Sequence, residues 1–317
     1  MLRLLSVVMM MMRVRSMTVS VGQPRKKILT HSFSSAPKIR TLASSEVPPT
    51  TTDGKKEGHP VIILHGLLGQ GRNFRSWVQQ LSPSLGTARR AVTLDLRNHG
   101  NSFQDEDMSF DAMAEDVLNT MDSLGIESAS LLGHSLGGKV AMAAAFKSPE
   151  RVEKLCVLDM APAAYSVADG SQWKTNRSLI EALHGLKLKE LKDRRDADAK
   201  LAQSVLDPNI RAFALSNLQQ DPNTKELSWK CHLDAILQNL DYLATWDNNE
   251  HTYNGPTLFL AGSHSRYIRS VHLPTIERSF PNFALRTVPN AGHWLHAEAP
   301  KPTQNFAQEF LDFTHHP

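Results

Sequence analysis

Two short motifs contain residue types that could carry out acyl transfer. Ser135 lies in GHSLG (133–137), which matches the G-x-S-x-G pattern of a nucleophilic serine. His293 lies late in the chain, in NAGHWLHAEAP (290–300). A serine hydroxyl is a weak nucleophile at neutral pH and needs a base within hydrogen-bond reach. The two motifs predict that Ser135 attacks a carbonyl carbon while His293 carries the proton.

The residues on either side of Ser135 predict a strand, a tight turn and a helix. An apolar run, ASLLG (129–133), precedes the serine, and a run rich in small residues, KVAMAAAFKSPERV (139–152), follows it. A serine on such a turn has a strained backbone, and its close neighbours must be glycines to avoid a clash. This context favours a nucleophile over an incidental serine in a glycine-rich turn. Lys139, one helical turn later, is predicted to be structural, for example in an ion pair below the turn.

The pattern of apolar runs and helices along the rest of the chain predicts an α/β fold with a mostly parallel, doubly wound sheet. Its further apolar runs are continuous rather than alternating, as in strands buried on both faces. A helix is predicted from Ser109, a good N-cap, to Gly125. Between 163 and 254 no strand-like run occurs, and the segment is polar and helix-rich, which predicts a helical cap over a pocket. The further runs are VIILH (61–65), AVTLDL (91–96), KLCVLD (154–159), PTLFLA (256–261) and FALRTV (283–288).

Four ordered motifs resemble those of the α/β-hydrolase superfamily, over residues 58–314. They are HGLLGQGRNF (65–74), DLRNHGNS (95–102), GHSLGGK (133–139) and NAGHWLHAEAP (290–300). Together they look most like the mitochondrial abhydrolase domain-containing protein 11 group and related small bacterial esterases. Yeast-type alcohol acetyltransferases are also similar. The resemblance implies an α/β-hydrolase fold with a helical cap insertion. It also implies that the protein is a serine esterase, which cleaves carboxylic esters or thioesters through an acyl-enzyme.

The oxyanion hole of such an enzyme consists of two backbone N–H groups. One belongs to the residue after the nucleophile, which is Leu136, and the other to Leu67 in the first motif. Asp95 is expected to fix the RNHGNS loop. His65 belongs to the His-Gly turn of the first motif and is expected to be structural. Four other histidines are expected to shape the site or the surface rather than act as the base; they are His99, His134, His264 and His296.

The acid of the triad is missing from its usual corner. The run TLFLAGSHSRYI (257–268) has Ser265 where many members have an aspartate, and no Asp or Glu occurs between Gly262 and Arg269. The enzyme could be inactive, could use a Ser–His dyad, or could take its acid from another strand end. Asp159 closes the run KLCVLD, and the resemblance implies that it orients His293 with Ser265 in a supporting role. The alternative is a purely structural Asp159.

Composition predicts three parts: a leader at 1–45, a polar linker at 46–58 and the hydrolase domain at 59–317, with its cap at 163–254. Residues 1–45 contain eight Lys or Arg and no Asp or Glu. This favours mitochondrial (matrix) import over plastid or secretory routing. The remaining 27 basic residues face 32 acidic ones, which gives no support to nucleic-acid binding. The apolar stretch at 4–12 is too short to span a bilayer, which takes about 20 residues.

No cofactor and no metal are expected. The only cysteines are Cys156 and Cys231, which make no disulfide framework, and no nucleotide-binding fingerprint is present. The expected partner is a small acyl ester or thioester. Two rival functions stay open: an alcohol acyltransferase on the same triad, and a non-catalytic binding partner of lipoylated mitochondrial dehydrogenase complexes, which the resemblance suggests.

Overall fold

The computed structural model describes residues 39–47, 57–165, 172–248 and 250–313. Its centre is a seven-stranded sheet with the order β1-β3-β2-β4-β5-β8-β9, in which only the β1–β3 pair is antiparallel. The predicted α/β class with a mostly parallel sheet is confirmed. The strands of this sheet are β1 (Ser44–Val47), β2 (Val61–Leu64), β3 (Ala91–Leu94), β4 (Ala129–His134), β5 (Val152–Leu158), β8 (Thr257–Gly262) and β9 (Phe283–Val288).

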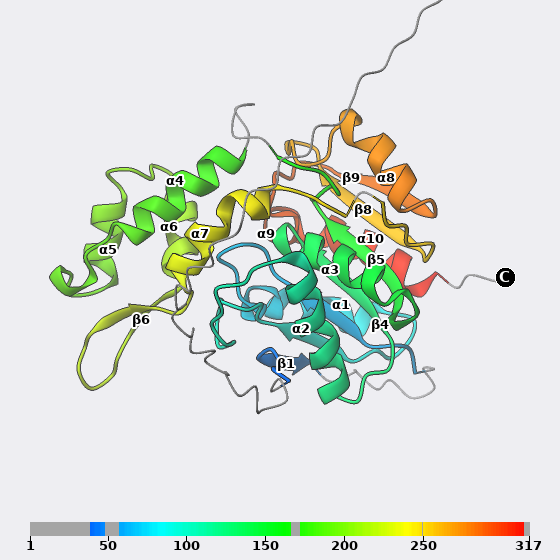
Figure 1. Cartoon of the computed structure of the whole chain (residues 1–317), viewed down its shortest axis with the longest axis horizontal. Coiled ribbons are helices and arrows are strands. Elements are labelled where there is room, and N and C mark those ends of the chain that lie inside the picture. The colour runs from blue at the N-terminus through cyan, green and yellow to red at the C-terminus, as the bar shows by residue number, and fades with distance from the viewer. Residues whose placement is uncertain (1–38, 48–56, 166–171, 249, 314–317) are drawn as a thin grey trace, which may run out of the picture. The chain divides into compact units, whose positions relative to one another are not determined.

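Helices cover both faces of this sheet, as Figure 1 shows. Successive residues of a strand point to opposite faces, so Ile62 packs in one apolar cluster with α2, α3 and α8, whereas Ile63 packs in another with α1 and α10. The helices are α1 (Arg75–Ser84), α2 (Phe110–Ser123), α3 (Leu136–Lys147), α4 (Gln172–His184), α5 (Arg194–Leu201), α6 (Pro208–Leu215), α7 (Leu233–Ala244), α8 (Leu273–Ser279), α9 (Leu295–Glu298) and α10 (Pro300–Asp312).

Helix α2 has the ends that its sequence predicts. The hydroxyl of Ser109 accepts a hydrogen bond from the amide of Ala112 at 3.3 Å, and Gly125 follows the helix with a φ of +66°. A positive φ is easy for glycine, which has no β-carbon. Thus the N-cap and the glycine stop limit this helix and bring its apolar face against α3.

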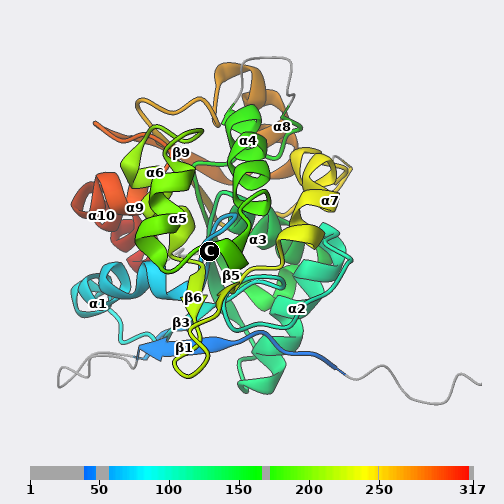
Figure 2. The ribbon, with the colours of Figure 1, turned by 90° about the vertical axis from the view of Figure 1, so that its left-hand side faces the viewer.

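The segment between β5 and β8, residues 163–254, is called the inserted segment below. It contains α4 to α7, which gather at one end of the sheet in Figure 1 and face the viewer in Figure 2. It also contains a short antiparallel hairpin, β6 (Leu218–Gln220) with β7 (Leu227–Trp229). The expectation of no strand in this segment is therefore wrong. Strands of three residues are too short to produce a readable apolar pattern.

The first strand lies where the sequence predicted leader and linker. The predicted boundary at residues 45 and 46 falls inside β1, which pairs with β3 at the edge of the sheet. The remaining parts of those predictions, at 1–38 and 48–56, lie outside the described residues. Among the residues that are described, no helix is long and apolar enough to cross a membrane.

Candidate active site

Ser135 stands on a strained turn between β4 and α3. Its φ of 53° and ψ of −117° are rare for a residue with a side chain, and such strain persists only where the surroundings enforce it. A β-carbon on Gly133 would lie 2.2 Å from the Gly137 carbonyl oxygen, and one on Gly137 would lie 2.4 Å from that of Leu64. Both glycines are therefore required sterically, and the turn holds the serine at the carboxyl end of the sheet.

Asp159, Ser265 and His293 come together at the ends of three neighbouring strands. Asp159 directly follows β5, is fully buried and has a φ of +52°. Its Oδ2 accepts a hydrogen bond from His293 Nδ1 at 2.7 Å and another from the Ser265 hydroxyl at 2.5 Å. Its Oδ1 accepts from the Gly262 amide at 3.1 Å. A buried carboxylate needs such partners, and these leave His293 with its other nitrogen, Nε2, for chemistry.

Ser135 and His293 line the same cavity. The hydroxyl of Ser135 donates to no other described residue, and catalytic hydrogen bonds of unliganded enzymes often tighten only with substrate. The arrangement can therefore support nucleophilic attack by the serine with the histidine as base.

The two predicted oxyanion donors flank this serine. Gly66 lies against it, since a β-carbon there would be 3.1 Å from Ser135 Cβ. Leu136 is the first residue of α3, so its amide has no acceptor within the helix. The amide of Leu67 likewise has no acceptor in the described part of the chain. Both N–H groups are thus available to an oxygen bound beside Ser135.

Two buried histidines hold the loop that carries Leu67. The Leu68 amide donates to His99 Nε2 at 3.1 Å, and the Leu96 amide donates to His65 Nε2 at 2.9 Å. Each ring therefore carries its proton on Nδ1. Desolvation lowers the pKa of His65 to about 4 and that of His99 to about 3. Both are neutral at physiological pH and act as structural supports, as expected.

The other histidines divide between site and surface. The ring of His134, whose Nε2 donates to the His293 carbonyl at 2.8 Å, fixes the loop of the base. His296 stacks on Phe74 at 4.1 Å between ring centroids and lines the cavity. Burial lowers the pKa of His296 to about 3. His264 is exposed and belongs to the surface.

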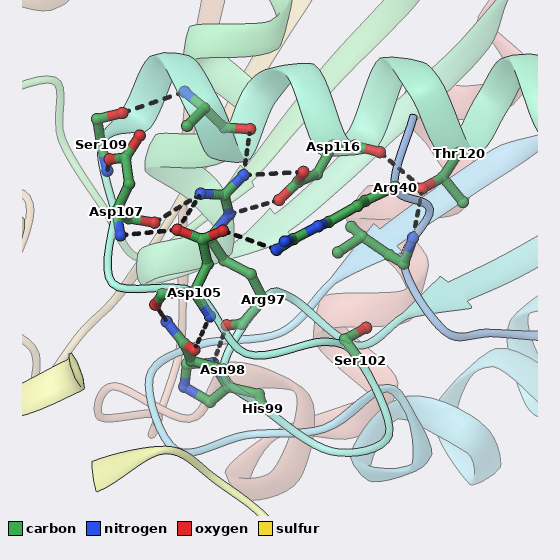
Figure 3. A network of polar contacts seen from close by, with 12 residues as sticks. Arg40, Arg97, Asn98, His99, Ser102, Asp105, Asp107, Ser109, Asp116 and Thr120 are labelled. Carbon is green, nitrogen blue, oxygen red and sulfur yellow. Dashed lines mark hydrogen bonds and ion pairs between the residues drawn. The ribbon is translucent and has the colours of Figure 1, made fainter. Parts of the chain in front are cut away.

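A polar network holds the RNHGNS loop in place (Figure 3). The guanidinium of Arg97 donates to both carboxylate oxygens of Asp116 in α2, at 2.6 and 2.9 Å. Arg40 pairs with Asp105 at 2.8 Å, which ties the start of the described chain to the same loop. Asp95 accepts from the amides of Gly71 and Asn101, at 2.7 and 2.9 Å. The predicted role of Asp95 as a loop anchor agrees with these contacts.

Lys139 has a different partner from the predicted one. It is buried in α3, and no ion pair involving it occurs among the described residues. Its Nζ instead donates to the carbonyls of Leu243, Ala244 and Thr245 at 3.1, 3.3 and 2.6 Å, at the C-terminal end of α7. These carbonyls carry the negative end of the helix dipole. Lys139 therefore links the helix behind Ser135 to the inserted segment.

Replacing Lys139 with methionine is expected to lower the free energy of unfolding by about 2–4 kcal/mol, because three carbonyls lose their donor. Desolvation lowers the pKa of Lys139 to about 7, below its unfolded value of about 10.4. Stability of the wild type relative to the variant should therefore rise between about pH 7 and 10. Urea unfolding at pH 7 and 9 measures this. Lys147→Met, in the same helix but exposed, is the control; a pH-independent difference would contradict the account.

The cavity beside Ser135 combines the sheet end with the inserted segment. Its walls are mainly apolar, and the inserted segment contributes Asn176, Leu179 and Ile180 from α4 and Phe213 from α6. Trp294, next to the base, lies 5.7 Å from Phe213 between ring centroids. No group of three or more metal-ligating side chains occurs among the described residues. The cavity suits an apolar organic substrate that reaches the serine.

Sequence reasoning missed Tyr267 and Asn217. Tyr267 stacks on the ring of His293, with 3.9 Å between centroids, and Asn217 Nδ2 donates to the Leu68 carbonyl at 2.7 Å. Tyr267 lies in the run 257–268 and Asn217 lies in the inserted segment, but no pattern in either stretch marks the residue as part of a site, because these contacts reach residues far away in the sequence. Only the folded chain reveals them.

Comparisons with known proteins agree with this fold. The model of the family described as "alpha/beta hydrolase fold" matches residues 59–300. The "sn-1-specific diacylglycerol lipase ABHD11" of Mus musculus is 36% identical over 260 residues, 82% of this chain and 83% of that protein. A "Probable alcohol acetyltransferase" of Saccharomyces cerevisiae is 31% identical over 286 residues, 83% of this chain and 79% of its own length.

A solved structure named "Marine microorganism esterase" is similar in three dimensions as well. It superposes with a TM-score of 0.78 at 34% identity and covers 86% of this chain and 99% of its own.

Proposed function

The chain belongs to the family with the alpha/beta hydrolase fold, and on this premise we propose that it is a carboxylic ester hydrolase using Ser135, His293 and Asp159. The observation that carries the proposal is the 2.7 Å hydrogen bond between His293 and the buried Asp159, in the cavity that also contains Ser135. A carboxylate on Nδ1 sets the tautomer that a general base requires. The names of the lipase and esterase relatives support the same reaction class.

The proposed reaction forms and breaks an acyl-enzyme. Ser135 Oγ attacks the ester carbonyl as His293 Nε2 takes its proton, and the oxyanion binds the amides of Leu67 and Leu136. His293 then gives the proton to the leaving alcohol. Water, deprotonated by the same imidazole, attacks the acyl carbon. The bond from the acyl carbon to Ser135 Oγ then breaks, His293 returns the proton to Oγ, and the acid is released. Each oxyanion donor is expected to contribute about 10²–10³ in rate.

The proposed substrates are esters with an apolar acyl chain, and thioesters as a second class. The apolar walls of the cavity support the first choice, with Leu179, Ile180 and Phe213 acting as part of a cap over the chain. The lipid named for the Mus musculus relative is consistent with it. The mitochondrial location stays a prediction from the composition of residues 1–45, and the association with dehydrogenase complexes stays a prediction from the resemblance.

A second candidate is an alcohol acyltransferase. The relative named "Probable alcohol acetyltransferase" favours it, and the chemistry differs only in the last step, where an alcohol rather than water accepts the acyl group. The same serine, base and oxyanion donors would serve both reactions.

We expect hydrolysis to prevail, with a rate that rises with acyl-chain length until the cavity is filled. A series of p-nitrophenyl esters and acyl-CoA thioesters, with products quantified in the presence and absence of ethanol, tests this. Free acid as the main product supports the hydrolase. Ethyl ester as the main product would favour the acyltransferase, and no turnover of any member would contradict both.

A further inference from the structure

Tyr267 lies against the proposed base but has no role in the reaction described above. Its side chain is 2% exposed, and its ring lies on that of His293 with 3.9 Å between centroids and an interplanar angle of 22°. The ring therefore covers one face of the imidazole that must gain and lose a proton. A stacked tyrosine stabilises a cation over its face through the ring quadrupole.

Three hydrogen bonds hold Tyr267 in place, two at its backbone and one at its hydroxyl. The Tyr267 amide donates to the Ser265 hydroxyl at 3.2 Å, and its carbonyl accepts from the Tyr165 hydroxyl at 2.8 Å. The Tyr165 hydroxyl in turn accepts from the Ala161 amide at 2.9 Å, two residues after Asp159. The backbone of Tyr267 is thus tied to both sides of the acid.

The third tie reaches the inserted segment. Asn176 Nδ2, on α4, donates to the hydroxyl of Tyr267 at 3.2 Å. Leu179 and Ile180 of the same helix line the cavity beside Ser135. The helix that contacts substrate in the proposed function therefore also sets the rotation of the ring that covers His293.

We propose that Tyr267 is a positioning residue for the base: its ring holds the imidazole of His293 against Asp159 and favours the protonated imidazole formed during acyl transfer. The inference rests on the proposed function and adds a residue to its machinery. The effect is assigned to the ring itself, and the bond from Asn176 to its hydroxyl is a structural contact with α4.

Several other titratable groups lie near His293, and their charges could affect how activity depends on pH. Asp159, after β5, is the carboxylate on Nδ1, and Glu298, in α9, accepts from the backbone amides on either side of the base. The rings of His134 and His296 lie nearby, and desolvation lowers the pKa of both below the usual histidine range. They stay neutral near neutral pH, so the stacked Tyr267 ring can act on His293 without their titration.

The test compares Tyr267→Leu, which removes the ring, with Tyr267→Phe, which keeps the ring and loses only the bond to Asn176. Without the ring, the protonated base is less favoured. The ascending limb of the plot of kcat/KM against pH should therefore move to lower pH, by about half to one pH unit. The plateau should fall about tenfold, since the same cation is less stable in the transition state. Tyr267→Phe should keep the position of the limb.

Tyr253→Leu is the matched control, because Tyr253 is equally buried but lies away from the base, with its hydroxyl donating to the Val152 carbonyl. It should cost stability without moving the limb. If Tyr267→Leu does not fold, Tyr267→Met repeats the test, since methionine fills irregular space.

A second readout separates this inference from the proposed function. The titration midpoint of the His293 ring protons, followed by NMR and assigned with His293→Gln, should move in the same direction in Tyr267→Leu. A lowered plateau with an unmoved limb and unmoved midpoint would overturn the inference, and so would an equal shift in Tyr267→Phe. Hydrolysis that persists in Ser135→Ala would instead overturn the proposed function and leave the NMR result valid.

Discussion

Replacing Ser135 with alanine is expected to lower kcat by about 10⁶ while the protein stays folded. The loss is large because the acyl-enzyme cannot form, and the oxyanion donors alone give only the residual rate that binding supplies. Alanine fits the turn as serine does, since both have a β-carbon at the same φ of 53°. Initial rates on a short-chain p-nitrophenyl ester measure the effect, and circular dichroism checks the fold.

Ser263→Ala is the control for this variant. Ser263 is exposed in the turn after β8, and its hydroxyl contacts no other described residue. It should retain the wild-type rate. A Ser135→Ala enzyme that kept more than about 1% of wild-type kcat would mean that the turnover comes from another nucleophile.

Replacing Asp159 with asparagine is expected to lower kcat by about 10⁴. The amide has nearly the shape of the carboxylate, and asparagine tolerates the φ of +52° at this position, so the fold should survive. What is lost is the negative charge of the Asp159 carboxylate beside His293 Nδ1. That charge sets the tautomer of the imidazole and stabilises the imidazolium. Thermal unfolding together with steady-state kinetics separates this catalytic loss from a loss of stability.

The corner occupied by Ser265 offers a sharper version of this test. Because the Ser265 hydroxyl lies 2.5 Å from Asp159 Oδ2, an aspartate at 265 can bring a carboxylate close to His293 Nδ1. In the Asp159→Asn background, Ser265→Asp is expected to raise kcat at least about tenfold above that of Asp159→Asn alone. Ser265→Ala in the same background should not raise it. Equal rates in the two double variants, or a wild-type rate in Asp159→Asn alone, would assign Asp159 a purely structural role.

The turn around Ser135 could be predicted from the sequence because its geometry depends on local spacing. Glycines at 133 and 137 are needed because backbone carbonyls lie within 2.4 Å of where their β-carbons would be, and that requirement is readable as a motif. The expected place of Asp159 came from the resemblance, which implies a strand order in which the end of its strand lies near Ser265; in the structure β5 and β8 are adjacent.

The parts that the sequence missed depend on contacts between distant residues. Tyr267 stacks on a residue 26 positions later, and Lys139 donates to carbonyls about 105 positions later. Backbone carbonyls are the same in every sequence, so no residue type marks them as the partners of a lysine. The short β6–β7 hairpin was missed for another reason, since strands of three residues are too short to show an apolar pattern in the sequence.

The most direct test of the central claim is intact-mass spectrometry of the enzyme quenched during turnover of a p-nitrophenyl ester. We expect a covalent adduct with the mass of the acyl group, located on Ser135 by peptide mapping, that disappears as substrate is used up and never forms in Ser135→Ala. Steady turnover with an unmodified Ser135, or an adduct of the same mass and lifetime in Ser135→Ala, would contradict it.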